Sequence, residues 1–166
     1  MVLLHVTADG FLHHGARRYR CALGRGGIRA QKVEGDGITP SGRYPLRRLL
    51  YRADRLAQPV SQLAMAKIRP DDGWCDAPDD PAYNGPVTLP HGASAESMWR
   101  ADGLYDLVVI LGHNDAPVVP GAGSAIFMHV ASPGYGPTEG CVALARDDLV
   151  ALLVELDDSC EIQFSP

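Results

Sequence analysis

A histidine and a cysteine in the last third of the chain have the residue types and spacing of a base and a nucleophile. His129 lies near the end of an apolar run, residues 125–130, and Cys141 follows it by twelve residues, directly after Gly140. A thiol needs a neighbouring base to become a good nucleophile near neutral pH, and an imidazole on an adjacent strand supplies one. Gly140 would let a substrate carbonyl approach closely, and the backbone N–H groups of Gly140 and Cys141 would point at a developing oxyanion. The spacing alone is equally compatible with a histidine and a cysteine that are both buried in the core and never touch.

The segments around these two residues predict strands followed by a helix. Residues 107–111 form a continuous apolar run, which is typical of a buried strand, and residues 125–130 form a second one. After Cys141, leucines at positions 149, 152, 153 and 156 follow the helical i, i+3, i+4, i+7 pattern. We expect that helix to begin near residues 146–148, where acidic side chains suit its positive end, and residues 160–164 to form a closing strand.

The first third of the chain also reads as β structure. Residues 2–6 and 19–23 are predicted strands, and residues 43–46 are a predicted edge strand because they contain Pro45. Residues 70–95 are rich in Pro, Asp, Gly and Asn, and we interpret them as a long ordered loop. With no internal repeat or linker, residues 1–166 are expected to form a single domain, mainly β with one or two helices.

Composition limits the classes of partner. The net charge of −5 argues against nucleic acid, and the lack of 18 consecutive apolar residues argues against a transmembrane helix. The arginines at positions 17–29 and 43–55 form either solvated strand faces or a patch for an anionic polymer. The residues at the start of the chain do not read as a secretory signal.

The four cysteines show no CxxC spacing, so we expect neither a disulfide scaffold nor structural zinc, and we predict no metal and no cofactor. Cys21 and Cys160 lie in alternating apolar runs and are interpreted as core residues. Cys75 is a rival nucleophile to Cys141, but the neighbouring Asp76 would raise its pKa and weaken it.

Five further residues outside the His–Cys segment are candidates for substrate binding. Trp74 and Tyr83, together with Asn84, would form a wall over a peptide substrate, or else anchor the 70–95 loop. His113 and Asn114 follow a strand and would form a turn or contact the substrate. No second ligand accompanies His113 at a suitable spacing, so a metal site there is not expected.

Two motifs in this order resemble the catalytic domain of the YkuD-type L,D-transpeptidases. The first is the Thr-Pro-Ser-Gly turn at residues 39–42, and the second is the strand histidine followed by a glycine-containing loop and Thr138-Glu139-Gly140-Cys141. The resemblance runs from about residue 24 to residue 153 and implies a YkuD-like β-sandwich or barrel.

The resemblance also implies a reaction and roles for individual residues. The nucleophile, Cys141, would attack the carbonyl of the third residue, usually diaminopimelate, of a peptidoglycan stem peptide. D-Alanine would leave, and an amine from another stem would resolve the acyl-enzyme. His129 would be the base, oriented by the Val130 carbonyl; Gly140 would belong to the oxyanion environment, and Thr138 would position the loop. Carbapenem inhibition is a further implication.

Three departures from the family pattern point to an altered substrate site. Glu139 stands where histidine is usual, Ala143 stands where arginine or asparagine commonly contacts substrate, and the loop from His129 to Cys141 is short. Residues 73–76 and 137–144 are similar to a short-loop branch that is linked to 1,3 cross-links between L-alanine and diaminopimelate.

Several functions remain open on the sequence. An L,D-carboxypeptidase or amidase would use the same acyl-enzyme, a non-catalytic peptidoglycan-binding module would keep only the fold, and a cytosolic cysteine hydrolase would fit the start of the chain. The chemistry implied by the resemblance places the protein in the periplasm or cell envelope. The oligomeric state stays open.

Overall fold

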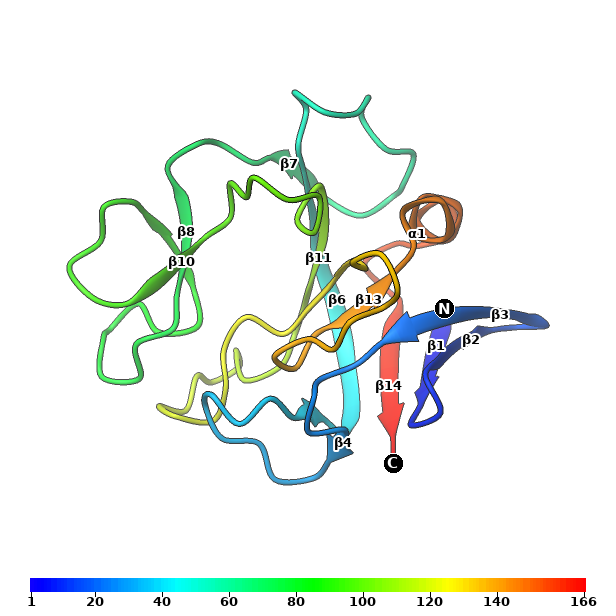
Figure 1. Cartoon of the computed structure of the whole chain (residues 1–166), viewed down its shortest axis with the longest axis horizontal. Helices are drawn as coiled ribbons and strands as arrows, with labels where there is room; N and C mark the ends of the chain where they lie inside the picture. Colours follow the sequence, from blue (N-terminus) through cyan, green and yellow to red (C-terminus); the bar gives the residue numbers. More distant parts are fainter.

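The computed structural model describes residues 1–166 and contains fourteen strands and one helix (Figure 1). In chain order these are β1 (Leu3–Thr7), β2 (Phe11–His14), β3 (Arg17–Ala22), β4 (Ile28–Arg29), β5 (Thr39–Pro40), β6 (Gly42–Tyr51), β7 (Met65–Lys67), β8 (Asp72–Cys75), β9 (Pro86–Thr88), β10 (Ala95–Ser97), β11 (Leu107–Leu111), β12 (Phe127–Val130), β13 (Val142–Leu144), α1 (Arg146–Leu153) and β14 (Glu161–Ser165). The structure contains no helix with the length and apolar character needed to cross a membrane.

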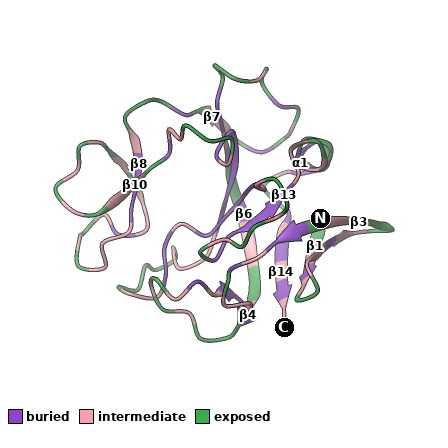
Figure 2. Cartoon of the chain, viewed as in Figure 1, coloured by how far each residue is buried: buried purple, intermediate pink, exposed green.

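The main sheet closes on itself as a barrel. Its strand order is β11-β12-β13-β3-β2-β1-β14-β6-β7, and β11 also pairs with β6, so the strands from β11 round to β6 form a ring with β7 attached outside it. Side chains that point inward from these strands form one apolar core, which includes Leu4, Met128 and Phe164. A barrel of this size is just wide enough for side chains to fill it. Buried residues accordingly concentrate in the strands, and exposed ones in the surrounding loops (Figure 2).

The apolar runs at β11 and β12 are buried on both faces, as predicted. Val109, Leu111 and Met128 point into the barrel core, whereas Val108 and Phe127 belong to a second, smaller apolar cluster on the outside of the barrel. Because adjacent residues of a strand point to opposite faces, a strand covered on both sides shows no alternation of apolar and polar residues.

The predicted helix is also present, as α1, and three of its leucines at positions 149, 152 and 153 are fully buried in the barrel core. Asp147 and Asp148 lie in its first turn, where a negative charge suits the positive end of the helix dipole. Cys21 and Cys160 are buried in the same core, which agrees with their interpretation as core residues.

The segment at residues 70–95, predicted as a long ordered loop, also contains short strands of a small sheet, of strand order β10-β8-β9, with turns and loops between them. We call the segment from residue 72 to residue 97 the lobe; Figure 1 shows its strands β8 and β10 beside the barrel, on the far side of β11 from β1 and β2. The prediction missed these strands because they are only three or four residues long, so they carry too little periodicity to recognise.

The segment predicted as an edge strand is part of β6, which is not at an edge. It pairs with β14 along residues 42–45 and with β11 and β7 further on. The pairing of β6 with β11 begins at Leu46, so Pro45 comes one residue before it. The Pro45 carbonyl oxygen accepts the N–H of Gly112 at 2.8 Å. The position needs no N–H for the β11 ladder, so proline is tolerated inside the sheet.

Candidate active site

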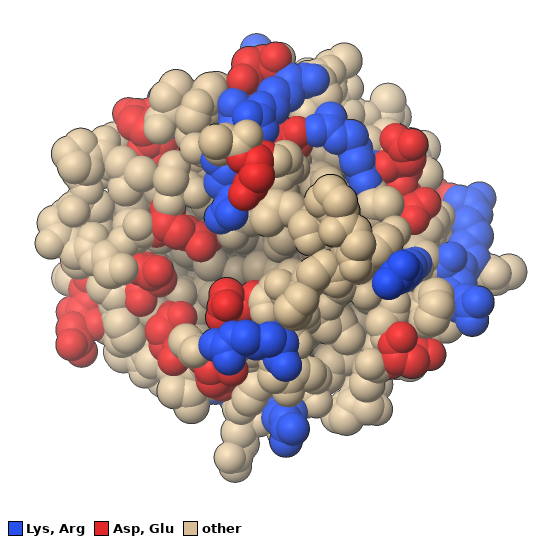
Figure 3. Space-filling model, in the orientation of Figure 1, with Lys and Arg blue, Asp and Glu red and all other residues tan.

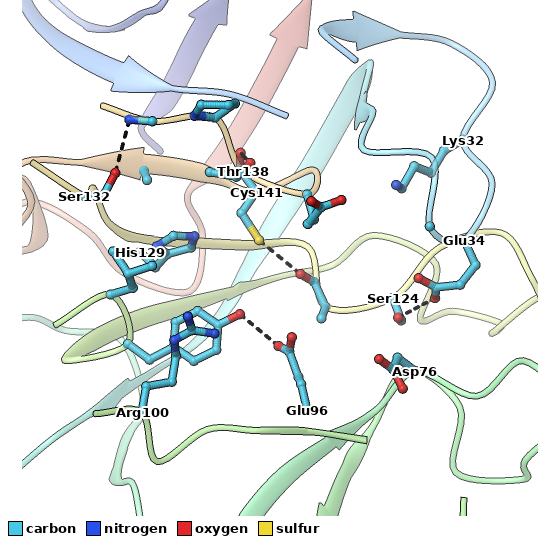
Figure 4. A pocket seen from close by; sticks show the side chains of 18 residues that line it. Lys32, Glu34, Asp76, Glu96, Arg100, Ser124, His129, Ser132, Thr138 and Cys141 are labelled. Atoms are coloured by element: carbon cyan, nitrogen blue, oxygen red, sulfur yellow. Dashed lines mark hydrogen bonds between the residues drawn. The ribbon is translucent and has the colours of Figure 1, made fainter. Parts of the chain in front are cut away.

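The sheet register places Cys141 and His129 on the same face of the barrel wall. Strands β12 and β13 run parallel with His129 opposite Ala143, and Cys141 precedes Ala143 by two residues. Residues two apart in an extended chain share a face, so both side chains point outward, toward the lobe. They line one cavity of about 400 Å³, and Figure 4 shows the imidazole and the sulfur directed into it from neighbouring segments.

The tautomer of His129 is fixed by its own backbone. Nδ1 lies 2.9 Å from the carbonyl oxygen of Val130, which can only accept, so Nδ1 carries the proton and Nε2 keeps a lone pair. The ring also packs edge-on against Tyr105, with 5.3 Å between centroids. Burial lowers the pKa of His129 to about 4, so the imidazole is neutral at physiological pH, which is the form that can take a proton.

Cys141 is held by two backbone groups of the preceding strand segment. Its thiol donates to the carbonyl oxygen of Ala125 at 3.2 Å, and the N–H of Phe127 donates to its sulfur at 3.4 Å. Burial raises the pKa of this thiol to about 12, while the Phe127 hydrogen bond acts in the opposite direction. The resting site therefore holds a neutral thiol and a neutral imidazole.

The turn that presents the nucleophile is fixed by Thr138 and requires Gly140. Thr138 Oγ1 donates to the Cys141 carbonyl oxygen at 2.7 Å and accepts the N–H of Gly140 at 3.1 Å. Gly140 has φ of +139°, and a Cβ at this position would lie 2.8 Å from the carbonyl oxygen of Ile38. Only glycine adopts this conformation without strain, and only glycine leaves room for the neighbouring chain.

The walls of the cavity carry charges of both signs. Lys32 and Arg100 contribute the positive charges, and Glu34, Asp76, Glu96 and Glu139 contribute the negative ones. In the space-filling view, acidic and basic side chains are interspersed around a hollow, without a large patch of either sign (Figure 3).

Several of these charged residues already pair with other groups of the protein. Lys32 Nζ lies 2.6 Å from Asp36, and Glu96 accepts the Tyr105 hydroxyl at 2.8 Å. Burial raises the pKa of Glu96. Glu139 is exposed and pairs with Arg25 at 3.1 Å.

Most of these wall residues were not predicted as site residues from the sequence. Lys32, Glu34, Asp76, Glu96 and Arg100 lie in loops or in the short lobe strand β10, outside the histidine–cysteine motif. They meet only because barrel closure and the lobe bring distant segments together.

Two of the lobe residues singled out in the sequence, Trp74 and Tyr83, do not line this cavity. The Trp74 ring packs edge-on against Phe127, with 5.1 Å between centroids. The Tyr83 hydroxyl donates to Glu34 at 2.7 Å and accepts the N–H of Gly123 at 3.0 Å. Both aromatic side chains anchor the lobe to the barrel.

His113 and Asn114 also lie outside the cavity. His113 packs edge-on against Tyr44, with 5.3 Å between ring centroids. Asn114 has φ of +51° and donates to the carbonyl oxygens of Val119 and Gly123, so it shapes the turn after β11.

Asn84 links the lobe to the nucleophile. Its Oδ1 accepts Trp74 Nε1 at 3.1 Å and the N–H of Ala125 at 3.0 Å, and its Nδ2 donates to the carbonyl oxygens of His113 and Asn114. Ala125 has φ of +55°, which is uncommon for a residue with a side chain. Asn84 thus holds in place the residue whose carbonyl accepts the Cys141 thiol.

A fixed imidazole and a thiol on a glycine turn, sharing one cavity, are the groups that a cysteine-nucleophile enzyme with a histidine base requires. Sequence comparison identifies the family: the model of the YkuD family, described as the L,D-transpeptidase catalytic domain, matches residues 6–162. The chain belongs to this family, which confirms the resemblance seen in its motifs. No match was found among curated proteins.

Solved L,D-transpeptidases resemble the structure at low sequence identity. An L,D-transpeptidase from Mycobacterium smegmatis is 13% identical, with a TM-score of 0.47 over 99% of this chain and 58% of that one. L,D-transpeptidase 3 from Mycobacterium tuberculosis, in complex with a faropenem-derived adduct, is 13% identical, with a TM-score of 0.48 over 99% of this chain and 60% of that one. The chain thus spans about three fifths of the length of these proteins.

Proposed function

We propose that this protein is a peptidoglycan L,D-transpeptidase that forms an acyl-enzyme on Cys141. The observation that carries the proposal is the shared cavity of Cys141 and His129, in which the His129 tautomer leaves Nε2 free to accept the thiol proton. The acyl donor is the diaminopimelate residue of a stem peptide, and the acceptor is an amine of a second stem.

Each step moves one proton through His129. The Cys141 sulfur attacks the donor carbonyl carbon while its proton passes to Nε2, and the imidazolium then protonates the leaving D-alanine amine as the C–N bond breaks. In the second half, the acceptor amine attacks the thioester and gives its proton to Nε2, and the thiol is regenerated.

The oxyanion of each tetrahedral intermediate needs an N–H donor beside the nucleophile. The Gly140 N–H already donates to Thr138 Oγ1, so we assign the main role to the Cys141 N–H. Gly140 contributes chiefly by allowing the turn and by leaving the approach to the sulfur open.

The charged walls fit a substrate that carries an ammonium group and carboxylates, as diaminopimelate does. Asp76 Oδ1 is buried without a hydrogen-bond partner and lines the cavity, so it is available to a substrate ammonium. Arg100, which is paired with Asp102 at 2.7 Å, carries a positive charge on the cavity wall, where Ala143 carries none. We propose that Arg100 contacts a substrate carboxylate in place of the residue usual in the family.

Product analysis tests this function. The purified protein is incubated with a disaccharide tetrapeptide as donor together with a free stem tetrapeptide, whose L-alanine amine is unblocked, and the products are resolved by mass spectrometry. Cross-linked dimers are expected from the native chain and from Cys160→Ala, in which a different buried cysteine is replaced, and none from Cys141→Ala. Tripeptides without dimers would show a carboxypeptidase instead, and unchanged turnover by Cys141→Ala would refute the proposal.

The type of cross-link follows from fragmentation of the same dimers. The likeness of residues 73–76 and 137–144 to a short-loop branch supports 1,3 links between L-alanine and diaminopimelate. Dimers linked only between two diaminopimelate residues would contradict this finer assignment.

Two further properties go with the proposed function. The substrate places the enzyme in the cell envelope, which fractionation of cells that express the native gene would test. A carbapenem should acylate Cys141, as the resemblance to the family implies. Intact mass spectrometry should show one adduct per chain, and none on Cys141→Ala.

A further inference from the structure

A second group of reactive side chains lies in the lobe, apart from the catalytic cavity. Cys75, Asp80 and His91 each offer one ligand atom, and these atoms all lie within 4.8 Å of one another. The distance between His91 Nε2 and Asp80 Oδ1 is 3.3 Å. None of the three residues lines the cavity of Cys141 and His129.

The spacing of these atoms suits a small tetrahedral cation. Zinc bonds of about 2.0–2.3 Å to nitrogen, oxygen and sulfur put neighbouring ligand atoms roughly 3.3–3.8 Å apart. The His91–Asp80 distance already falls in this range, and the other separations need only a small contraction. Cys, His and carboxylate side chains are all zinc ligands, and three protein ligands completed by a water can make up the tetrahedral set.

The state of each donor also favours a cation. His91 Nε2 is buried and makes no hydrogen bond, although Asp80 lies near it. The N–H of Ala82 donates to Asp80 Oδ1 at 2.8 Å and is the largest of the effects that lower the pKa of that carboxyl group, so Asp80 is ionised. The Cys75 side chain is fully buried, which raises the pKa of its thiol, while a hydrogen bond from the backbone of Ala77 acts in the opposite direction. A bound divalent cation would ionise that thiol outright.

We propose that Cys75, Asp80 and His91 form a zinc site that holds the lobe together. The ligands are five and eleven residues apart, without a close cysteine pair, which is why the spacing of the cysteines alone predicts no zinc. The ion would close the segment from residue 75 to residue 91, and this segment contains Asp76 on the cavity wall and Asn84 behind Ala125. Zinc binding would thus stabilise one wall of the active site without touching a reacting atom.

Cobalt titration tests this site without any assay of turnover. The full-length protein is stripped with a chelator in a Cys141→Ala background, so that the catalytic thiol cannot contribute, and is then titrated with Co²⁺. We expect one Co²⁺ per chain, with a thiolate-to-cobalt charge-transfer band in the near ultraviolet and tetrahedral bands in the visible. Zinc should displace the cobalt, and both metals should raise the unfolding temperature.

Matched variants assign the bands to the three ligands. Cys75→Ser should abolish the charge-transfer band, and Asp80→Asn and His91→Gln should each weaken metal binding at least tenfold. Asp79→Asn, which changes the exposed neighbouring carboxylate, and His13→Gln should leave binding unchanged. A titration without a charge-transfer band would overturn the proposal, as would a band that persists in Cys75→Ser, whether or not the protein cross-links peptidoglycan.

Discussion

The turn before the nucleophile can be tested by giving Gly140 a side chain. In Gly140→Ala, the backbone must keep φ of +139°, which costs a residue with a side chain about 1–3 kcal/mol. The new Cβ would also lie 2.8 Å from the Ile38 carbonyl oxygen, and relieving such overpacking costs about 1–3 kcal/mol more. We therefore expect the free energy of unfolding to fall by about 4 kcal/mol, measured by urea denaturation.

Gly121→Ala is the matched control for this experiment. Gly121 also has a positive φ, of +80°, but a Cβ there meets nothing within 4 Å, so only a backbone cost of about 1–2 kcal/mol is expected. A shift of the Cys141 sulfur by about 1 Å can cost on the order of 100-fold in rate, so Gly140→Ala should lose most of its kcat/KM and Gly121→Ala little. Equal losses of stability and activity in the two variants would refute the reasoning about this turn.

Three further predictions concern the same site. Burial raises the pKa of the Cys141 thiol to about 12, so its rate of alkylation by iodoacetamide, measured by peptide mapping, should rise about tenfold per pH unit from pH 6 to 10. A rate that stays constant between pH 5 and 8 would instead indicate a thiolate–imidazolium pair. Asn84→Ala removes four hydrogen bonds of about 1 kcal/mol each and releases Ala125, so both the midpoint of urea denaturation and kcat should fall. An unchanged kcat would show that Ala125 does not need these hydrogen bonds to keep its position. Thr138→Val removes the two hydrogen bonds to Gly140 and Cys141, so kcat should fall about 10–100-fold with KM little changed. Thr138→Ser keeps the hydroxyl and should have a kcat close to that of the native protein. A low kcat in Thr138→Ser would argue against a positioning role for the hydroxyl.

The sequence predicts the parts of the site that are encoded locally. His129 and Cys141 lie on one short stretch of strand, loop and glycine turn, and the chemistry of a thiol with a nearby base follows from residue types alone. The buried strands β11 and β12 could also be predicted, because continuous apolar runs are typical of strands covered on both faces.

The parts that depend on distant segments could not be predicted. The lobe strands are too short for a periodic signal, and Trp74 and Tyr83, which we considered as a substrate wall, pack instead against Phe127 and Glu34. The charges at Asp76 and Arg100 reach the cavity only through tertiary contacts, which no local pattern encodes.

The central claim is that the Cys141 sulfur becomes acylated with His129 as its base. Its most direct test is intact mass spectrometry of the protein, quenched in acid during turnover of a tetrapeptide muropeptide, followed by mapping of the modified peptide. We predict a thioester of the donor peptide, lacking the terminal D-alanine, on Cys141, at least 100-fold slower to form in His129→Gln. An acyl group on another cysteine, or one formed at the native rate without His129, would contradict the account.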